Sequence, residues 1–216
     1  MEFDQLLHLL GDLPAFNSSL LLAGNVNPEN VRLQLSRWTR SGRVYQLRRG
    51  LYAIAPPYQK VIPHPFLVAN LMQRASYVSL QSALSFYGLI PETMQATLSV
   101  TAGRPERRIT PLGAFEFRHI RRDLLRGYRM TELQGSKPGQ QALMATPEKA
   151  LLDLVYLTPG GGTIGYLREL RLQNMERLDV DELHHQAEFF DTPKLLRAAE
   201  TIAGLAKKEP EEFESL

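Results

Sequence analysis

The sequence contains no cysteine among its 216 residues. That absence excludes disulfide scaffolds, thiolate nucleophiles and cysteine-ligated zinc, and it fits a reducing compartment. No run approaches the roughly 18 apolar residues that a membrane span requires. The first residues, MEFDQLLHLLGDLP, carry acids before a short amphipathic run, whereas a signal peptide begins with basic residues and continues with an unbroken apolar stretch. We therefore expect a cytoplasmic protein with no membrane partner.

Acidic residues are also missing from one particular stretch. Between residues 32 and 49 there are six arginines and no Asp or Glu, although the formal net charge of the whole chain is only +2. A second basic stretch, residues 104–129, holds eight arginines against three acids, and the chain from residue 179 onward reverses sign with ten acids against four basic residues. Clustered like charge opposes compaction unless a partner neutralises it, so the two basic stretches indicate a polyanion partner.

The first forty residues carry signals for three helices. Leucines at helical spacing precede Pro14, which predicts a first helix of about two turns. Asn17 can cap a short second helix that ends at Gly24. Asn27 followed by Pro28 predicts the start of a third helix, because a capping side chain precedes a proline at the first helical position. The 44% hydrophobic content is sufficient for a folded core.

The third helix is predicted to be amphipathic and basic. Val31, Leu35 and either Trp38 or Thr39 share its apolar face. The segment RVYQLRRGLYAI (residues 43–54) follows at once and reads as a β-hairpin that turns at Gly50 and leaves Arg48 and Arg49 in water. This order of elements is that of a winged helix-turn-helix, in which the third helix enters the major groove of DNA and the hairpin lies along the backbone.

Arginine pairs with guanine edges, glutamine with adenine, and arginine or serine holds phosphates. The expected DNA-binding residues are Arg32, Gln34, Ser36, Arg37, Arg40, Arg43, Arg48 and Arg49. Two plainer interpretations remain open: the hairpin tip is a solvated turn, or the domain is an adaptor that binds another protein.

The segment APPYQKVIPHP (residues 55–65) has four prolines, too many for a helix or a central strand, and marks a domain boundary. We expect a DNA-binding domain over residues 1–57, a linker over 58–65 and a second domain over 66–216. The patterns after the linker predict helices near residues 66–75, 79–87, 146–157, 163–173, 179–190 and 192–207, and strands at 97–101, 113–120 and 127–133. The expected fold class is α+β: an N-terminal winged helix-turn-helix domain followed by a larger mixed α/β domain.

Several segments of this chain resemble the AbiEi-type antitoxins of bacteria. The stretches are SYVSLQSALSFYGLIPE (76–92), SVTAGRPERRI followed by GAFEFRHI, ATPEKALLDLVYL (145–157) and the hairpin pattern RSGRVYQLRRGLYAI. The resemblance covers roughly residues 28–160 and does not extend past about residue 175.

The resemblance implies a bacterial toxin-antitoxin module. The protein would repress its own operon by binding inverted repeats in double-stranded DNA, and would oppose a cognate toxin similar to nucleotidyltransferases, with or without direct contact. The second domain would be the antitoxin domain and would carry a further basic surface. The residues expected on that surface are Arg104, Arg107, Arg108, Arg118, Arg121 and Arg122. His119 lies among them, and we expect it to be a core residue in preference to a phosphate contact.

Two patterns suggest enzyme chemistry, and we expect neither to carry it. PGGGTIG (159–165) satisfies G-x-G-x-x-G, but a helix precedes it where the dinucleotide fingerprint needs a strand. The competing hypothesis is a metal-dependent enzyme acting on nucleic acid, with Glu148 and Asp153 as ligands. Glu148 is better explained by the positive end of its helix dipole. The expectation is a protein that is not an enzyme and needs no cofactor or metal.

Overall fold

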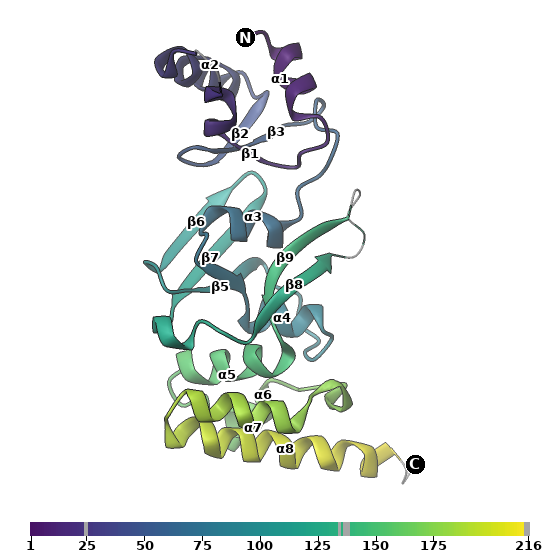
Figure 1. The fold of residues 1–216 in the computed structure, drawn as a ribbon. Helices are drawn as coiled ribbons and strands as arrows, with labels where there is room; N and C mark the ends of the chain where they lie inside the picture. Colours follow the sequence, from purple (N-terminus) through teal and green to yellow (C-terminus); the bar gives the residue numbers. More distant parts are fainter. Residues whose placement is uncertain (24–25, 134, 136–138, 214–216) are drawn as a thin grey trace.

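The structure, a computed structural model, describes residues 1–23, 26–133, 135 and 139–213. It is an α+β fold, as expected, and it holds two clusters of buried hydrophobic residues. Figure 1 shows the N-terminal region at one end, a six-stranded sheet in the middle and a layer of helices at the other end, with the two termini far apart. No helix within the described ranges combines the length and the apolar character needed to cross a membrane.

The N-terminal region contains two α-helices, one 3-10 helix and a small sheet. Its elements are α1 (Phe3–Leu10), β1 (Phe16–Asn17), η1 (Ser18–Leu22), α2 (Pro28–Arg40), β2 (Val44–Arg48) and β3 (Leu51–Ile54). The three strands pair in the order β1-β3-β2, and both pairs are antiparallel. The predicted first helix, third helix and hairpin are confirmed.

The start of α2 follows the predicted capping pattern. The Asn27 side chain accepts a hydrogen bond from the backbone N–H of Glu29 at 2.8 Å, and Pro28 occupies the first helical position. An N-cap of this kind stabilises a helix by about 1 kcal/mol. The buried residues Val31, Leu35 and Trp38 then lie on one side of the helix, so Trp38 takes the core position and Thr39 is only half-buried. The inner side of α2 therefore anchors it to the first core.

The short second helix differs from its prediction. Asn17 precedes η1, but its side chain makes no capping hydrogen bond. The residue instead belongs to β1 and pairs with Leu51, while its neighbour Phe16 pairs with Tyr52. The sequence did not reveal this strand because two residues are too few for a periodic pattern. Gly24, the predicted end of the helix, lies outside the described residues.

The hairpin of β2 and β3 contributes to both cores. Val44 and Ile54 belong to the first cluster, with α1 and α2. Leu47, Leu51 and Ala53 belong to the second cluster, with α3 and the large sheet. Alternate residues of a strand point to opposite faces, which is how one short hairpin buries side chains on both sides. The two regions are therefore packed together through the small sheet.

The larger region is built on a mixed six-stranded sheet. Its strands are β4 (Ser76–Val78), β5 (Ala96–Thr101), β6 (Glu106–Thr110), β7 (Gly113–His119), β8 (Tyr128–Leu133) and β9 (Gln140–Ala145). The order is β6-β7-β5-β4-β9-β8, and the β5/β7 and β4/β9 pairs are parallel. Strands β5, β7 and β8 were predicted and are confirmed.

Three strands were not predicted, each for a different reason. Strand β4 is only three residues long, too short to show alternation. Strand β6 reads ERRIT and lies at the sheet edge, where charged residues are tolerated. Strand β9 reads QQALMA, and Gln, Ala and Met are not residues that favour strands. Pairing with neighbouring strands, more than local sequence, made all three segments strands.

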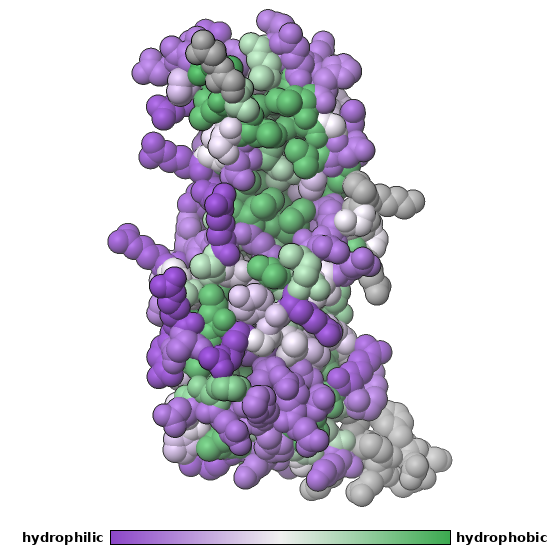
Figure 2. Space-filling model, viewed as in Figure 1, coloured by the Kyte–Doolittle hydropathy of each residue, from purple (hydrophilic) through white to green (hydrophobic). Residues whose placement is uncertain are grey.

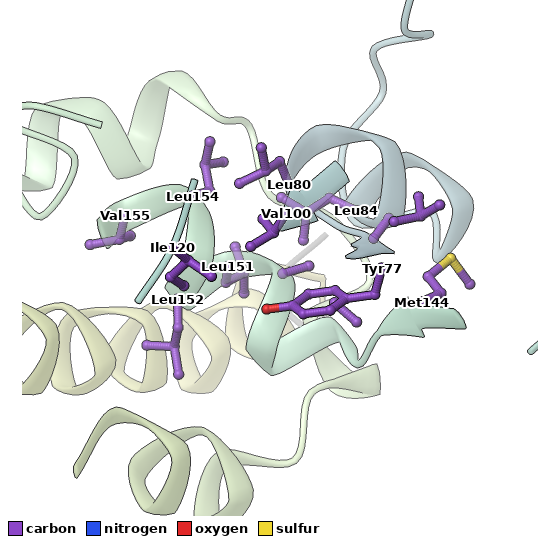
Figure 3. Close-up of a cluster of buried hydrophobic side chains, with 14 of the residues drawn as sticks. Tyr77, Leu80, Leu84, Val100, Ile120, Met144, Leu151, Leu152, Leu154 and Val155 are labelled. Atoms are coloured by element: carbon purple, nitrogen blue, oxygen red, sulfur yellow. The ribbon is translucent and has the colours of Figure 1, made fainter. Parts of the chain in front are cut away.

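Helices cover the larger sheet and form the far end of the molecule. They are α3 (Pro65–Met72), α4 (Leu80–Phe86), α5 (Pro147–Leu157), α6 (Ile164–Glu169), α7 (Val180–Phe189) and α8 (Pro193–Phe213), with short 3-10 turns η2 (Arg122–Leu124) and η3 (Met175–Arg177). All six were predicted, although α6 is shorter and α8 longer than expected. Figure 3 shows part of the core, where Leu151 of α5 points toward Val100 and Tyr77 of the sheet.

Candidate nucleic-acid interface

The outer side of α2 presents a row of polar and basic side chains. Arg32, Ser36, Arg37 and Arg40 are all exposed. In the part of the chain that the structure describes, no carboxylate lies within ion-pair distance of these three arginines. Because their positive charge is not neutralised within the protein, it is available to an anion. We call these four residues the basic face of α2.

Gln34 and Arg43, two other predicted contacts, interact with α1 and its neighbours. The Gln34 side-chain amide donates to the Met1 carbonyl at 3.0 Å on the flank of α2. The Arg43 guanidinium lies 5.1 Å from the centre of the Phe3 ring, a cation–π contact at the open end of the hairpin. Arg43 remains exposed, whereas Gln34 is half-buried. Gln34 is therefore a poor candidate for reading a base edge.

The two arginines of the hairpin tip do different things, which corrects the expectation that both lie in water. Arg49 is exposed. Arg48 is half-buried, and its guanidinium donates to the carbonyl of Leu71 at 3.3 Å and to that of Arg49 at 3.2 Å. The Nε of Arg48 is buried without a hydrogen-bond partner among the described residues. Arg48 therefore ties the hairpin to the end of α3, whereas Arg49 has no acidic partner among the described residues.

Half of the predicted second basic surface is already neutralised within the protein. Arg108 pairs with Glu106, Arg121 with Asp123 at 2.9 Å, and Arg118 lies 3.9 Å from Glu116. Arg118 also donates to the Leu157 carbonyl at 3.1 Å. The acids that the sequence places among these arginines are thus their partners in space, and the surface is less positive than the arginine count implies.

The other three arginines of this surface are exposed and unpaired. Arg104, Arg107 and Arg122 face solvent, and among the described residues none of them has an acidic partner. Arg104 lies close in space to the hairpin tip, because Gln73 donates to its carbonyl at 3.2 Å and the Leu71 carbonyl two residues earlier binds Arg48. The exposed arginines of the second region therefore start close to the hairpin tip.

His119 was expected in the core and is instead exposed. Its Nδ1 lies 2.9 Å from the Gly103 carbonyl, beside Arg104. The residue ends β7, where the strand leaves the sheet and the alternation of buried positions stops. His119 thus belongs to the basic loop.

The two carboxylates of the enzymatic hypothesis do not converge. Glu148 accepts a hydrogen bond from the backbone N–H of Asp179 at 2.9 Å. Asp153 is fully buried and accepts from Tyr77 at 2.9 Å and from Ser79 at 2.8 Å, and it also pairs with Lys149. Among the described residues, no group of three His, Cys, Asp or Glu side chains could hold a metal ion. Both carboxylates have structural partners.

The buried Lys149–Asp153 pair is the feature that sequence reasoning missed. Lys149 also donates to the Tyr77 hydroxyl at 2.9 Å, and its side chain is 1% exposed. Burial lowers the pKa of Lys149 and raises the pKa of Asp153, while the charge of each opposes the shift of the other. Burial and then the charge of Asp153 raise the pKa of Tyr77, which keeps its hydroxyl protonated as a donor. The signal was a Lys and an Asp four residues apart in a helix that, apart from Glu148 in its first turn, is otherwise largely apolar.

The glycine-rich segment is a loop between helices, as predicted. Residues 159–163 lie between α5 and α6, and the last two residues of the segment begin α6, which Thr163 caps by accepting from the backbone N–H of Tyr166. Lys194 of α8 donates to the carbonyls of Val155 and Thr158 at 2.5 and 2.8 Å. These contacts close the end of α5, and no strand precedes the glycines as a dinucleotide site would require.

Surface hydropathy separates the two ends of the molecule. Figure 2 shows apolar surface gathered on the N-terminal part of the displayed face and mostly hydrophilic side chains over the opposite end. Leu20, Leu22, Val26 and Leu33 are exposed apolar residues of this N-terminal region. Two of them, Val26 and Leu33, line a cavity of about 300 Å³ beside α2 that is also lined by Arg37 and Trp38.

Comparison with known proteins leaves the resemblance to AbiEi-type antitoxins as a prediction. No protein-family model matches this chain, and no curated protein sequence matches it.

Proposed function

We propose that this protein binds double-stranded DNA through a winged helix-turn-helix in its N-terminal region. The observation that carries the proposal is the basic face of α2, whose three arginines are exposed and have no carboxylate partner among the described residues. Phosphate contacts from such arginines supply affinity, and contacts with base edges supply sequence specificity. In this proposal α2 is the recognition helix.

The order of elements supports this assignment. A helix, a short strand, a second short helix, the basic helix and a hairpin follow one another, and the strands pair as β1-β3-β2. In a helix-turn-helix protein the recognition helix lies in the major groove. The inner side of α2 is fixed by Val31, Leu35 and Trp38, so its basic face is held outward for that contact.

The remaining exposed arginines extend the proposed contact. Arg49 at the hairpin tip would bind the phosphate backbone, and Arg104, whose carbonyl binds Gln73 near the end of α3 that Arg48 contacts, would continue the contact into the second region. Arg48 has a different role, because its guanidinium is committed to the Leu71 carbonyl. It would position the hairpin and would not itself hold a phosphate.

The biological role we propose is that of an autorepressor and antitoxin in a bacterial toxin-antitoxin module. Its operator would be inverted repeats upstream of its own gene, and its cognate toxin would resemble a nucleotidyltransferase. The support for this role is the resemblance of residues 28–160 to AbiEi-type antitoxins. Co-expression with the product of the neighbouring gene tests it: the wild-type protein should relieve growth arrest, and failure to do so would remove the antitoxin role while leaving DNA binding intact.

The first experiment measures binding to the duplex just upstream of the gene, in salt from about 50 to 200 mM, beside a scrambled duplex. Affinity for the upstream duplex should fall steeply with salt, and Arg49→Ala should weaken it and reduce the salt slope by about one. The matched control is Arg171→Ala, which removes an exposed arginine paired with Glu92 far from α2 and should change nothing. Equal binding to both duplexes, or binding insensitive to salt, would contradict the proposal.

A further inference from the structure

A second cavity, of about 290 Å³, lies in the larger region and has no part in the proposed DNA contact. It is formed where the start of α3, the helix α4 and the segment leading into β5 meet. The lining residues that matter here are His64, Phe66, Ser85, Phe86, Met94 and Thr97. Its size lies just below the range in which proteins bind small molecules, about 300 to 1,000 Å³.

The walls of this cavity are largely aromatic. The rings of His64 and Phe66 meet edge to face with centroids 4.9 Å apart, and the rings of Phe66 and Phe86 are 6.0 Å apart. All three rings are half-buried, so each keeps a part of its surface available. Met94 adds a thioether, a group that adapts to flat aromatic surfaces. Such walls favour a planar ring that can pack against them.

Thr97 supplies a hydroxyl without a partner. The residue is 92% buried, since only 8% of its surface is exposed, and its hydroxyl makes no hydrogen bond to any described residue. Ser82, beside it, differs: its hydroxyl accepts from the Leu98 N–H at 2.9 Å and donates to the Ala96 carbonyl at 3.3 Å. A hydroxyl that lines a cavity on a largely buried residue, and that has no hydrogen-bond partner among the described residues, is free to pair with a ligand.

His64 fixes the polarity of the opposite wall. Its Nδ1 accepts from the backbone N–H of Phe66 at 3.1 Å, so the ring proton resides on Nε2. Burial lowers the pKa of His64, which favours the neutral ring. Among the described residues that line the cavity there is no Lys, Arg, Asp or Glu to act as a counter-ion for a charged group.

We propose that this cavity binds the planar ring of a neutral heteroaromatic ligand, the class to which purine bases and nucleosides belong. The ring would pack against Phe66 and Phe86, and its nitrogen and oxygen atoms would pair with the hydroxyls of Thr97 and Ser85. Ser85 is half-buried, and its hydroxyl is also unpaired within the described chain. The proposal does not depend on DNA binding.

The probe is adenosine, titrated into the full-length protein without DNA and followed by calorimetry, with ribose as the non-aromatic comparison. We expect saturable binding of adenosine with a Kd below about 1 mM, a reduction of about three- to tenfold in Thr97→Val, and no binding of ribose. Ser85→Trp should fill the cavity and abolish binding. Ser19→Trp places the same side chain at an exposed position of the other region and should bind as the wild type does.

Failure of the wild type to bind adenosine, or equal binding by Thr97→Val and the wild type, would overturn the proposal. Thr97→Val keeps the shape of the side chain, so it gives an answer even where Ser85→Trp fails to fold. Thermal unfolding of each variant without ligand shows whether the variant has folded.

Discussion

The two arginine-rich stretches of this chain differ in what their guanidinium groups face. Along α2, Arg32, Arg37 and Arg40 point to solvent with no carboxylate partner among the described residues. In the larger region, Arg108 and Arg121 are paired with acids of their own stretch, and Lys149 is buried against Asp153. The two arginine-rich stretches therefore present different charge to a partner. The position of the acids in space, more than the number of arginines, decides which stretch can bind a polyanion.

The largest expected effect is a loss of stability on removing the partner of Lys149, the buried cation that is paired with Asp153. Asp153→Asn leaves Lys149 buried without a counter-ion, and breaking a buried pair in this way costs about 3–5 kcal/mol of unfolding free energy. Urea denaturation measures the loss. The double variant Lys149→Met/Asp153→Leu removes both charges and should recover much of it. A loss below about 1 kcal/mol in the single variant would mean that the pair is not held as a buried ion pair.

The next effect concerns the cations that face solvent. Arg37→Ala/Arg40→Ala should weaken binding to the upstream duplex at least tenfold, because a guanidinium on a base edge contributes about 1–3 kcal/mol. Both residues are exposed, so the unfolding free energy should stay within about 0.5 kcal/mol of the wild type. Competition binding measures the DNA affinity, and urea denaturation measures the unfolding free energy. Unchanged affinity in this folded variant would remove α2 as the recognition helix.

A smaller effect separates free from paired arginines within the second stretch. Arg104→Ala/Arg107→Ala should lower DNA affinity about three- to tenfold and reduce the salt slope by about two, since each free cation can displace a counterion. Arg108→Ala/Arg121→Ala removes the same number of positive charges from arginines that already have acidic partners. That variant should bind within about twofold of the wild type. Equal losses in the two variants would mean that internal pairing does not decide which arginines bind.

The smallest expected effect is a pH dependence of stability that arises from His64, whose neutral form is favoured by burial. His64 caps α3 through Nδ1, and burial lowers its folded-state pKa below the ordinary value of 6.5. The unfolded chain therefore binds the proton first as pH falls, so stability is complete above pH 6.5 and declines as pH falls through the folded-state pKa. Protonated Nδ1 cannot accept the Phe66 N–H, a loss of about 1 kcal/mol.

His64→Asn is the matched control for this pH effect. Asparagine caps helices without titrating, so the variant should be as stable as the wild type near neutral pH. The part of the decline below pH 6.5 that belongs to His64 should be absent when the unfolding free energy of the variant is measured against pH. Identical pH profiles would show that the cap does not contribute to the decline.

Local patterns predicted most of the helices because their signals lie within a few residues. Asn27 and Pro28 fixed the start of α2, and Thr146 and Pro147 fixed that of α5. The same patterns could not predict β4, β6 and β9. Those strands depend on partners distant in the chain, such as the pairing of Val78 with Met144, because β4 is too short to show alternation, β6 is rich in charged residues and β9 is poor in residues that favour strands.

The sequence by itself determined the α+β class, the amphipathic α2 and the separation of acidic and basic stretches, because each depends on residue identity and near-neighbour spacing. Only the tertiary structure decided which charges are free. Arg48 and Arg49 are adjacent and chemically identical, yet one binds the Leu71 carbonyl and the other faces solvent. Lys149 and Asp153 form a buried pair because the fold brings Tyr77 and Ser79, more than 70 residues earlier in the chain, into hydrogen-bond contact with them. The sequence determines which residues are charged, and the fold determines which partner each charge has.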